Sequence, residues 1–212
     1  MGDSRIQRAI GGVYSWAADR VYEPVVIKGS FRVLGKGLYP LVEDQGRRAV
    51  EAANGRPILD VPVGTAYFTT ETAARHTGAV VGVDYAWGMA ERARRDSAHV
   101  GLSNLSVIQA DIHRLPFADE AFGAVLCTNG LQVIPGLQGA LGELVRVLAP
   151  RAPLLVSVIV APVGAALPGF AARRLPTILR SGPDIAGEIA AARLTVTSVR
   201  RSRLAYLIEA VK

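Results

Sequence analysis

The chain has 212 residues, of which 50% are hydrophobic and 20% are charged, and it carries a formal net charge of +6 at pH 7. This composition excludes an intrinsically disordered chain and is typical of one globular domain that buries a sizeable core. The single cysteine, Cys127, excludes an intramolecular disulfide and has no neighbouring metal ligands, so we expect no metal and a reducing, cytoplasmic location.

The N-terminal region, residues 1–55, is expected to form a helical cap. Its first forty residues lack a clean periodicity, and they are interpreted as one or two helices with a loop from Gly29 to Gly37. Residues 41–53 then have the pattern of a helix, which Asn54 and Gly55 are expected to end.

From residue 57 onward, short apolar runs alternate with helical segments. The apolar, β-branched runs predict strands, and the amphipathic segments predict helices. The expected strands are residues 57–61, 79–83, 105–109, 122–127, 154–160, 194–199 and 204–211. The expected helices are residues 67–76, 88–96, 137–148 and 184–192.

This alternation predicts an α/β fold, a Rossmann-like mixed sheet of seven strands with helices on both faces. The first five strands are apolar throughout, which is typical of parallel strands buried on both sides. The last two are joined by a short turn, so the last strand is expected to be antiparallel and to insert beside a parallel neighbour. We expect a single domain over residues 1–212, with the cap, a ligand-binding core at 56–160, and a loop, a helix and a hairpin at 161–212.

Two further stretches bear on partners. Residues 152–172 carry no charge and are long enough for about one membrane span, but three prolines interrupt them, so no span is expected. Arg193, Arg200, Arg201 and Arg203 alternate with apolar residues and are interpreted as the solvated face of a hairpin. The sequence therefore argues against a nucleic-acid partner, and it leaves the oligomeric state open, a homodimer included.

Carboxylates follow three of the expected parallel strands, where open α/β sheets bind ligands. Asp60 ends the first strand, and Gly64 allows the backbone to approach a ligand closely before the next helix. Asp84 ends the second strand and can accept both hydroxyls of a ribose, while Asp111 follows the third and can accept from an adenine amine. Ribose, adenine and an amino-acid tail together make up S-adenosylmethionine (SAM).

Four motifs in this order resemble the class I SAM-dependent methyltransferases, and among them the UbiE-like small-molecule methyltransferases. The matching segments are residues 60–66, 84–89, 111–117 and 140–150. The resemblance covers about residues 57–160 and implies a SAM-binding core there, with the acceptor on the side of residues 161–212. The residues that it assigns to the cofactor are Asp60, Pro62, Gly64, Thr65, Asp84, Tyr85, Met89, Asp111, Ile112 and Asn129.

Several residues depart from the family pattern, and one pair, Arg151 and Ala152, replaces the usual two glycines before the fifth strand. Pro62 and Ala66 stand where the family has glycines, and Gly123 stands where it usually has aspartate. Pro62 lacks a backbone N–H, and Ala66 adds a methyl where the ligand comes close. These changes keep open a SAM-binding regulatory or partner subunit without turnover. A nicotinamide-dinucleotide site is the rival for this fold, but only Gly64 of its glycine fingerprint is in place.

Catalytic residues are the least defined part of the site. His113 lies two residues beyond Asp111, and Tyr14 belongs to the cap, which covers the site in the enzymes that the chain resembles. Both are candidates for a general base. His76 is expected at the surface and Trp87 in the core.

The acceptor is expected to be a small molecule, because the chain has no long insertion or added domain to handle a macromolecule. Our leading hypothesis is methylation, by in-line displacement, of a hydroxyl oxygen on a sugar, lipid-linked or secondary-metabolite acceptor. An RNA-directed methyltransferase is the alternative that rests on the basic net charge.

Overall fold

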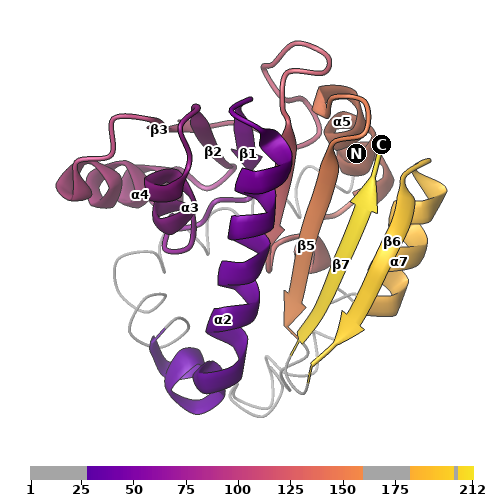
Figure 1. The fold of residues 1–212 in the computed structure, drawn as a ribbon, viewed down its shortest axis with the longest axis horizontal. Coiled ribbons are helices and arrows are strands. Elements are labelled where there is room, and N and C mark those ends of the chain that lie inside the picture. The colour runs from indigo at the N-terminus through magenta and orange to yellow at the C-terminus, as the bar shows by residue number, and fades with distance from the viewer. Residues whose placement is uncertain (1–27, 160–181, 203–204) are drawn as a thin grey trace.

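The computed structural model describes residues 28–159, 182–202 and 205–212. Its strands form one seven-stranded sheet in the order β3-β2-β1-β4-β5-β7-β6, with helices on both faces (Figure 1). The strands are β1 (Ile58–Asp60), β2 (Val80–Asp84), β3 (Leu105–Gln109), β4 (Ala124–Thr128), β5 (Pro153–Ile159), β6 (Thr195–Arg201) and β7 (Ala205–Val211). The helices are α2 (Lys28–Ala53), α3 (Thr69–Arg75), α4 (Trp87–Val100), the 3₁₀ helix η2 (Leu131–Val133), α5 (Leu137–Val147) and α7 (Gly182–Ala191).

The strand order reverses at β1, which pairs in parallel with both β2 and β4. Asp60 is therefore in register with Gly82 on one side and with Leu126 on the other. Strand β7 inserts between β5 and β6 and is antiparallel to both, as the opposite directions of β5 and β7 show (Figure 1). The mixed seven-stranded sheet with an antiparallel last strand is confirmed, and the carboxyl ends of β1 to β5 lie at one edge.

Two apolar clusters, one on each face, hold the helices to the sheet. Successive strand residues alternate between the clusters, so that Ile58 packs with the residues of α2, α3 and α4, and Leu59 packs with those of α5 and α7. Helix α5 presents Leu137, Leu141 and Leu144 to the core, which confirms the amphipathic pattern of this segment. The helices thus cover both faces and leave the ends of the strands for polar groups.

The N-terminal prediction needs correction, because the expected loop from Gly29 to Gly37 is part of α2, a helix of 26 residues with Pro40 inside it. An interior glycine costs a helix only about 1 kcal/mol relative to alanine, so scattered glycines do not end a helix by themselves. The predicted end holds: α2 stops at Ala53, and Asn54 and Gly55 both take positive φ angles.

Two side chains differ from the prediction in their burial. His76 is buried at 6% exposure, because its Nε2 lies 2.9 Å from the Arg56 carbonyl oxygen and joins the end of α3 to the start of β1. Trp87 is 54% exposed at the first turn of α4, and the Arg94 guanidinium lies over its ring. The inward side of α4 is occupied instead by Met89 and small residues.

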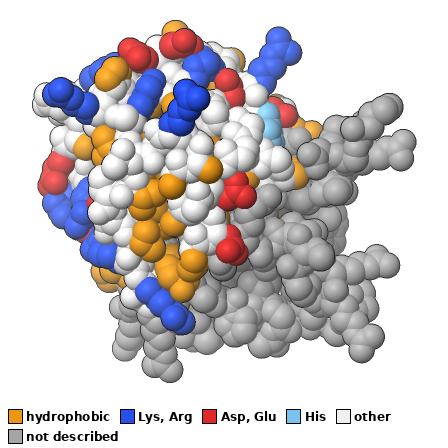
Figure 2. Space-filling view, turned by 90° about the vertical axis from the view of Figure 1, so that its right-hand side faces the viewer, with side chains coloured by type: hydrophobic (Ala, Val, Ile, Leu, Met, Phe, Trp, Pro, Cys, Tyr) orange, Lys and Arg blue, Asp and Glu red, His pale blue; other side chains and the backbone are white. Residues whose placement is uncertain are grey.

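The arginine-rich hairpin has the predicted solvated face, since Arg200 and Arg201 are exposed on the edge strand β6. Figure 2 shows the side of the molecule with α7 and β6, where basic side chains are scattered among apolar and acidic ones. None of the helices in the described ranges is long and apolar enough to cross a membrane.

Candidate functional site

Asp60 is a buried carboxylate at the end of β1. Its side chain is 2% exposed, and its Oδ2 accepts a hydrogen bond from Thr69 Oγ1 at 2.6 Å. Its Oδ1 is buried and accepts no hydrogen bond from the described residues. Burial, helped by the negative charge of Asp84, raises the pKa of Asp60 to about 7. Asp60 is therefore a strongly desolvated carboxylate, and one of its oxygens has no partner among the described residues.

Asp84, at the end of β2, holds the loop that follows β1. Its Oδ2 accepts from the Gly64 N–H and its Oδ1 from the Ala86 N–H, both at 2.9 Å. Burial raises its pKa to about 6, against the lowering effect of these N–H donors. Gly64 has a φ of +56°, and a Cβ at this residue would meet no atom of the described residues within 4 Å. The described part of the chain therefore leaves the backbone of Gly64 uncovered beside two carboxylates, as close approach to a ligand requires.

Pro62 joins this loop to the residues after β4. Its neighbours donate within the sheet, Val61 N–H to the Leu126 carbonyl and Val63 N–H to the Val83 carbonyl. A Cβ at Gly130 would lie 2.2 Å from Pro62 Cγ, so the proline ring rests directly on the glycine backbone. Pro62 thus fixes the spacing between the loops after β1 and β4.

Two other departures from the family pattern, Ala66 and Gly123, pack against protein atoms. Ala66 has a φ of +58°, but it is fully buried among apolar residues on the α2 side of the sheet. Gly123 precedes β4 at the amino edge, where a Cβ would lie 2.9 Å from the Ala53 carbonyl oxygen and 2.8 Å from Arg56 Cβ. A side chain at Gly123 is excluded by the end of α2, so this glycine has a packing explanation.

The Asp111 side chain, beyond the end of β3, is tied to His113. Asp111 Oδ1 accepts from the His113 N–H and lies 2.9 Å from its Nδ1. The other ring nitrogen, Nε2, lies 2.9 Å from the Pro135 carbonyl oxygen in the loop after η2. Both ring nitrogens of His113 are thus engaged, and the ring links the end of β3 to the segment after β4.

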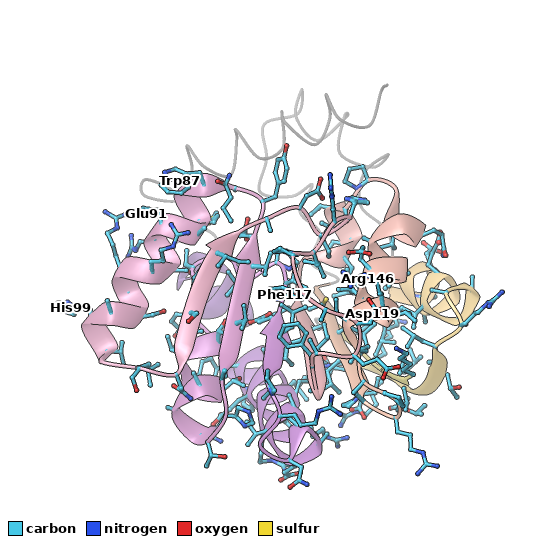
Figure 3. All side chains as sticks on the ribbon, turned by 90° about the horizontal axis from the view of Figure 1, so that it is seen from above. Trp87, Glu91, His99, Phe117, Asp119 and Arg146 are labelled. Carbon is cyan, nitrogen blue, oxygen red and sulfur yellow. The ribbon has the colours of Figure 1, made fainter. Side chains whose placement is uncertain are left out.

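The loop after Asp111 is bound to α5 by an ion-pair cluster. Arg146 donates to Glu143, to Asp119 and to the carbonyl oxygens of Leu115 and Phe117, at 2.8–3.0 Å. Glu143 Oε2 also accepts the Leu115 N–H at 2.8 Å. Figure 3 shows Phe117, Asp119 and Arg146 together, away from the α4 residues Trp87, Glu91 and His99. The most family-like segment of the sequence therefore supports the loop that carries Asp111.

The remaining predicted site residues differ in how much surface they offer. Thr65, Met89 and Ile112 are buried. Tyr85 is half-buried, and its carbonyl accepts from Gln109 Nε2 at 3.0 Å. Asn129 has a φ of +56° at the end of β4, and its N–H donates to the Ser157 carbonyl. Tyr14 lies outside the described residues.

Two residues at this edge were missed by sequence reasoning. Thr69 donates to Asp60, and Gln132 donates from Nε2 to the Asn129 carbonyl oxygen at 3.0 Å while its buried Oε1 accepts nothing from the described residues. Thr69 is the first residue of α3, and Gln132 lies three residues beyond Asn129. That position after a strand end was the available signal for Gln132.

The polar groups at this edge fit SAM. The spare oxygen of Asp60 and the open backbone at Gly64 suit an amino-acid tail, and Asp84 and Asp111 are acceptors at the next two strand ends. The described residues contain no cluster of three or more histidine, cysteine or acidic groups that could hold a metal ion. A cofactor that is recognised mainly through its own hydroxyl and amine donors matches such a set of acceptors.

Solved structures share this fold. A SAM-dependent methyltransferase from Aquifex aeolicus is 18% identical in sequence and superposes with a TM-score of 0.69. The match covers 80% of this chain and 88% of that one. Geranyl diphosphate methyltransferase in complex with SAM is 14% identical with a TM-score of 0.64, and the match covers 80% of this chain and 84% of that one. The [4+2]-cyclase SpnF, 18% identical with a TM-score of 0.67 and 80% coverage of both chains, also has it. The fold alone therefore does not define the reaction.

Sequence relatives are more specific. Residues 58–151 match the family model described as a methyltransferase domain. A demethylmenaquinone methyltransferase from Thermus thermophilus is 41% identical over 114 residues, which are 52% of this chain and 51% of that protein. One from Corynebacterium urealyticum is 31% identical over 181 residues, 85% of this chain and 70% of that protein. The chain spans about half of the first relative's length and more than two thirds of the second's. Because it matches the second relative at 31% identity over most of both proteins and also matches the methyltransferase domain, the chain belongs to the class I SAM-dependent methyltransferases, within their UbiE-like group.

Proposed function

We propose that this chain transfers the methyl group of SAM to a small, apolar acceptor that carries ring hydroxyls, with a demethylated quinol as the first acceptor to test. The observation that carries the proposal is the row of carboxylates Asp60, Asp84 and Asp111 at three adjacent strand ends, beside the open backbone of Gly64. The quinone class is supported by the names of the relatives, which are demethylmenaquinone methyltransferases.

SAM supplies a methyl group on a sulfonium, which is already a good leaving group. The chain's own part is to bind and orient the two partners. We assign the ribose hydroxyls to Asp84, the adenine amine to Asp111, and the amino-acid tail to the loop of Gly64 and Thr65 with Asp60 beneath it. Orientation of the two reactants can supply roughly 7–11 kcal/mol of the barrier.

We assign His113 a positioning role in place of the general base considered from sequence. Its Nδ1 lies 2.9 Å from Asp111 Oδ1 and its Nε2 lies 2.9 Å from the Pro135 carbonyl oxygen, so proton abstraction would require one of these contacts to break. The ring holds the Asp111 carboxylate in place for the cofactor. Tyr14 stays a prediction.

The acceptor hypothesis changes with the relatives. Sequence reasoning favoured a hydroxyl oxygen of a sugar, lipid-linked or secondary-metabolite compound. A quinol shares the hydroxyls and the apolar body of that class, but it also offers ring carbon to the methyl group. We therefore propose a hydroxylated aromatic ring as the acceptor class and leave the choice between ring carbon and oxygen to the product analysis.

The test uses the full chain in two steps. Calorimetry with SAM and with its demethylated product, S-adenosylhomocysteine, should give dissociation constants well below the millimolar range. SAM with a radiolabelled methyl group is then incubated with 1,4-dihydroxynaphthalene under argon, and the product is identified by mass spectrometry and NMR. Binding of neither cofactor form contradicts the proposal, and tight binding without transfer to this ring or to a panel of hydroxylated acceptors favours a non-catalytic subunit.

A further inference from the structure

The residues after β4 hold a buried acceptor that the fold does not use. Gln132 folds back over the end of β4, because its Nε2 donates to the Asn129 carbonyl oxygen at 3.0 Å. A carbonyl cannot donate, so turning the amide over would remove this bond and place two acceptors face to face. The orientation of the amide is thereby determined, and Oε1 is the buried atom without a partner among the described residues.

Only one other buried side-chain atom in the described ranges shares this property, and it lies at the same edge. That atom is Asp60 Oδ1, at the end of β1. Strands β1 and β4 are direct neighbours, and the contact of Pro62 with Gly130 joins the loops that follow them. Because buried polar atoms in native proteins nearly always have partners, two unused acceptors at the point where the strand order reverses indicate a ligand that brings donors.

Gln132 lies on the opposite side of β1 from the residues that we assign to the ribose and the adenine. Asp84 and Asp111, which we assign to the ribose and the adenine, follow β2 and β3, on one side of β1. Gln132 follows β4, on the other side. The sulfonium end of SAM carries a methyl group and no N–H or O–H at the sulfur, so it offers Oε1 no conventional donor. We assign the ammonium group of the amino-acid tail to the loop of Gly64 and Thr65 with Asp60, so we expect the donor for Gln132 to come from the molecule that receives the methyl group.

We infer that Gln132 is a specificity-determining residue whose Oε1 accepts a hydrogen bond from a ring hydroxyl of the methyl acceptor. This inference rests on the proposed function and adds a group that selects the acceptor. The fixed Nε2 contact with Asn129 keeps the oxygen in one orientation, so an acceptor with an O–H is favoured over one whose hydroxyls are masked as ethers.

The test compares two ring compounds that differ only in their donors. Affinities of the full chain, saturated with S-adenosylhomocysteine, are measured by calorimetry under argon for 1,4-dihydroxynaphthalene and for 1,4-dimethoxynaphthalene. Gln132→Met keeps the length of the side chain but removes its hydrogen-bonding groups. We expect it to weaken binding of the diol by roughly 10-fold or more, the usual scale for an unpaired buried group, and to leave the diether unchanged.

The control is Gln138→Met, the same change at an exposed glutamine of α5 whose Nε2 donates to the Glu188 carbonyl oxygen. It should leave both ring affinities unchanged. Equal weakening of diol and diether by Gln132→Met would show that Gln132 only shapes the loop, and a fall in affinity for S-adenosylhomocysteine would make it a cofactor ligand; either result overturns the inference. A diol affinity unaffected by Gln132→Met overturns it too, whereas a wild-type chain that does not bind the diol contradicts the proposed acceptor itself.

Discussion

The polar side chains at the two edges of the sheet differ in how completely they are hydrogen-bonded within the chain. At the amino edge, Asn104 Nδ2 lies 2.9–3.2 Å from three carbonyl oxygens at the end of α3 and in the loop after it, and His76 pairs with the Arg56 carbonyl. At the carboxyl edge, Asp60 and Gln132 each bury an oxygen that accepts nothing from the described residues. At the amino edge, Asn104 and His76 thus have partners within the chain, whereas the carboxyl edge has two buried oxygens without a partner among the described residues.

Gly78 and Gly123 at the amino edge differ in a similar way from Gly64 at the carboxyl edge. At the amino edge, a Cβ at Gly78 would lie 2.3 Å from the Gly55 carbonyl oxygen, and one at Gly123 would lie 2.9 Å from the Ala53 carbonyl oxygen. At the carboxyl edge, a Cβ at Gly64 would meet no atom of the described residues within 4 Å. Backbone packs against backbone at the two amino-edge glycines, whereas the described residues leave the backbone of Gly64 uncovered where a ligand is expected. Changes at the amino edge should therefore alter stability, and changes at the carboxyl edge should alter binding.

The largest effect is expected for Asp84→Ala on SAM affinity. Loss of two hydrogen bonds from ribose hydroxyls to a carboxylate should weaken binding on the order of 100-fold, because bonds to charged groups contribute about 1.5–3 kcal/mol each. Calorimetry measures the affinity. Asp96→Ala, which removes an α4 carboxylate paired with Arg92, is the matched control and should leave it unchanged.

Asp84 also holds the Gly64 loop, so a second variant separates charge from shape. Asp84→Asn keeps an oxygen for the Ala86 N–H and should still lose most of the affinity. An affinity equal to that of the wild type in both variants would show that the ribose lies elsewhere.

Asn104→Ala tests the amino edge and should act on stability alone. The change leaves three carbonyl oxygens without their side-chain donor and should lower the free energy of unfolding by about 2 kcal/mol. Urea denaturation measures the loss, and calorimetry below the transition should give an unchanged SAM affinity. Weaker SAM binding by a folded variant would mean that the two edges are coupled.

Gly123→Ala and Gly142→Ala form a matched pair. The first adds a methyl against the backbone of Ala53 and should cost about 1–3 kcal/mol, typical of overpacking. The second adds a methyl inside α5 that meets nothing within 4 Å, and it should stabilise the protein by about 0.5–1 kcal/mol. Thermal and urea unfolding compare the two. Equal stability of both variants would remove the packing explanation for Gly123.

The sheet could be predicted from sequence because its parallel strands are short, mostly apolar runs and its last two strands are joined by a short turn, and β3 has the predicted bounds, Leu105–Gln109. The start of α2 could not, since glycine and Pro40 weaken a helix pattern without preventing a helix. The carboxylates Asp60, Asp84 and Asp111 were found because strand ends are visible in the pattern. Gln132 was not, because its position after a strand end does not by itself indicate a side chain that folds back on Asn129 or the burial of one oxygen.

A pH dependence of stability is also expected from the carboxyl edge. Burial raises the pKa of Asp60 to about 7 and that of Asp84 to about 6, above the value near 3.9 of an unfolded aspartate. At pH values between the unfolded and the folded pKa values, these two groups hold more protons in the folded chain than in the unfolded chain. The free energy of unfolding should therefore fall as the pH rises from about 5 to about 7. Each group contributes a slope of up to about 1.4 kcal/mol per pH unit.

The two carboxylates with lowered pKa values, Asp44 and Glu143, do not mask this slope. Hydrogen bonds from Arg47 and Arg146 lower the pKa values of Asp44 and Glu143, and the stability that these groups contribute is lost only at more acidic pH. Urea unfolding of the wild type and of Asp60→Asn at pH 5, 6, 7 and 8 isolates the contribution of Asp60. The variant should show the shallower slope between pH 5 and 7. Parallel curves would mean that the Asp60 carboxylate is solvated in the free protein, and that the carboxyl edge does not keep a desolvated acceptor for its ligand.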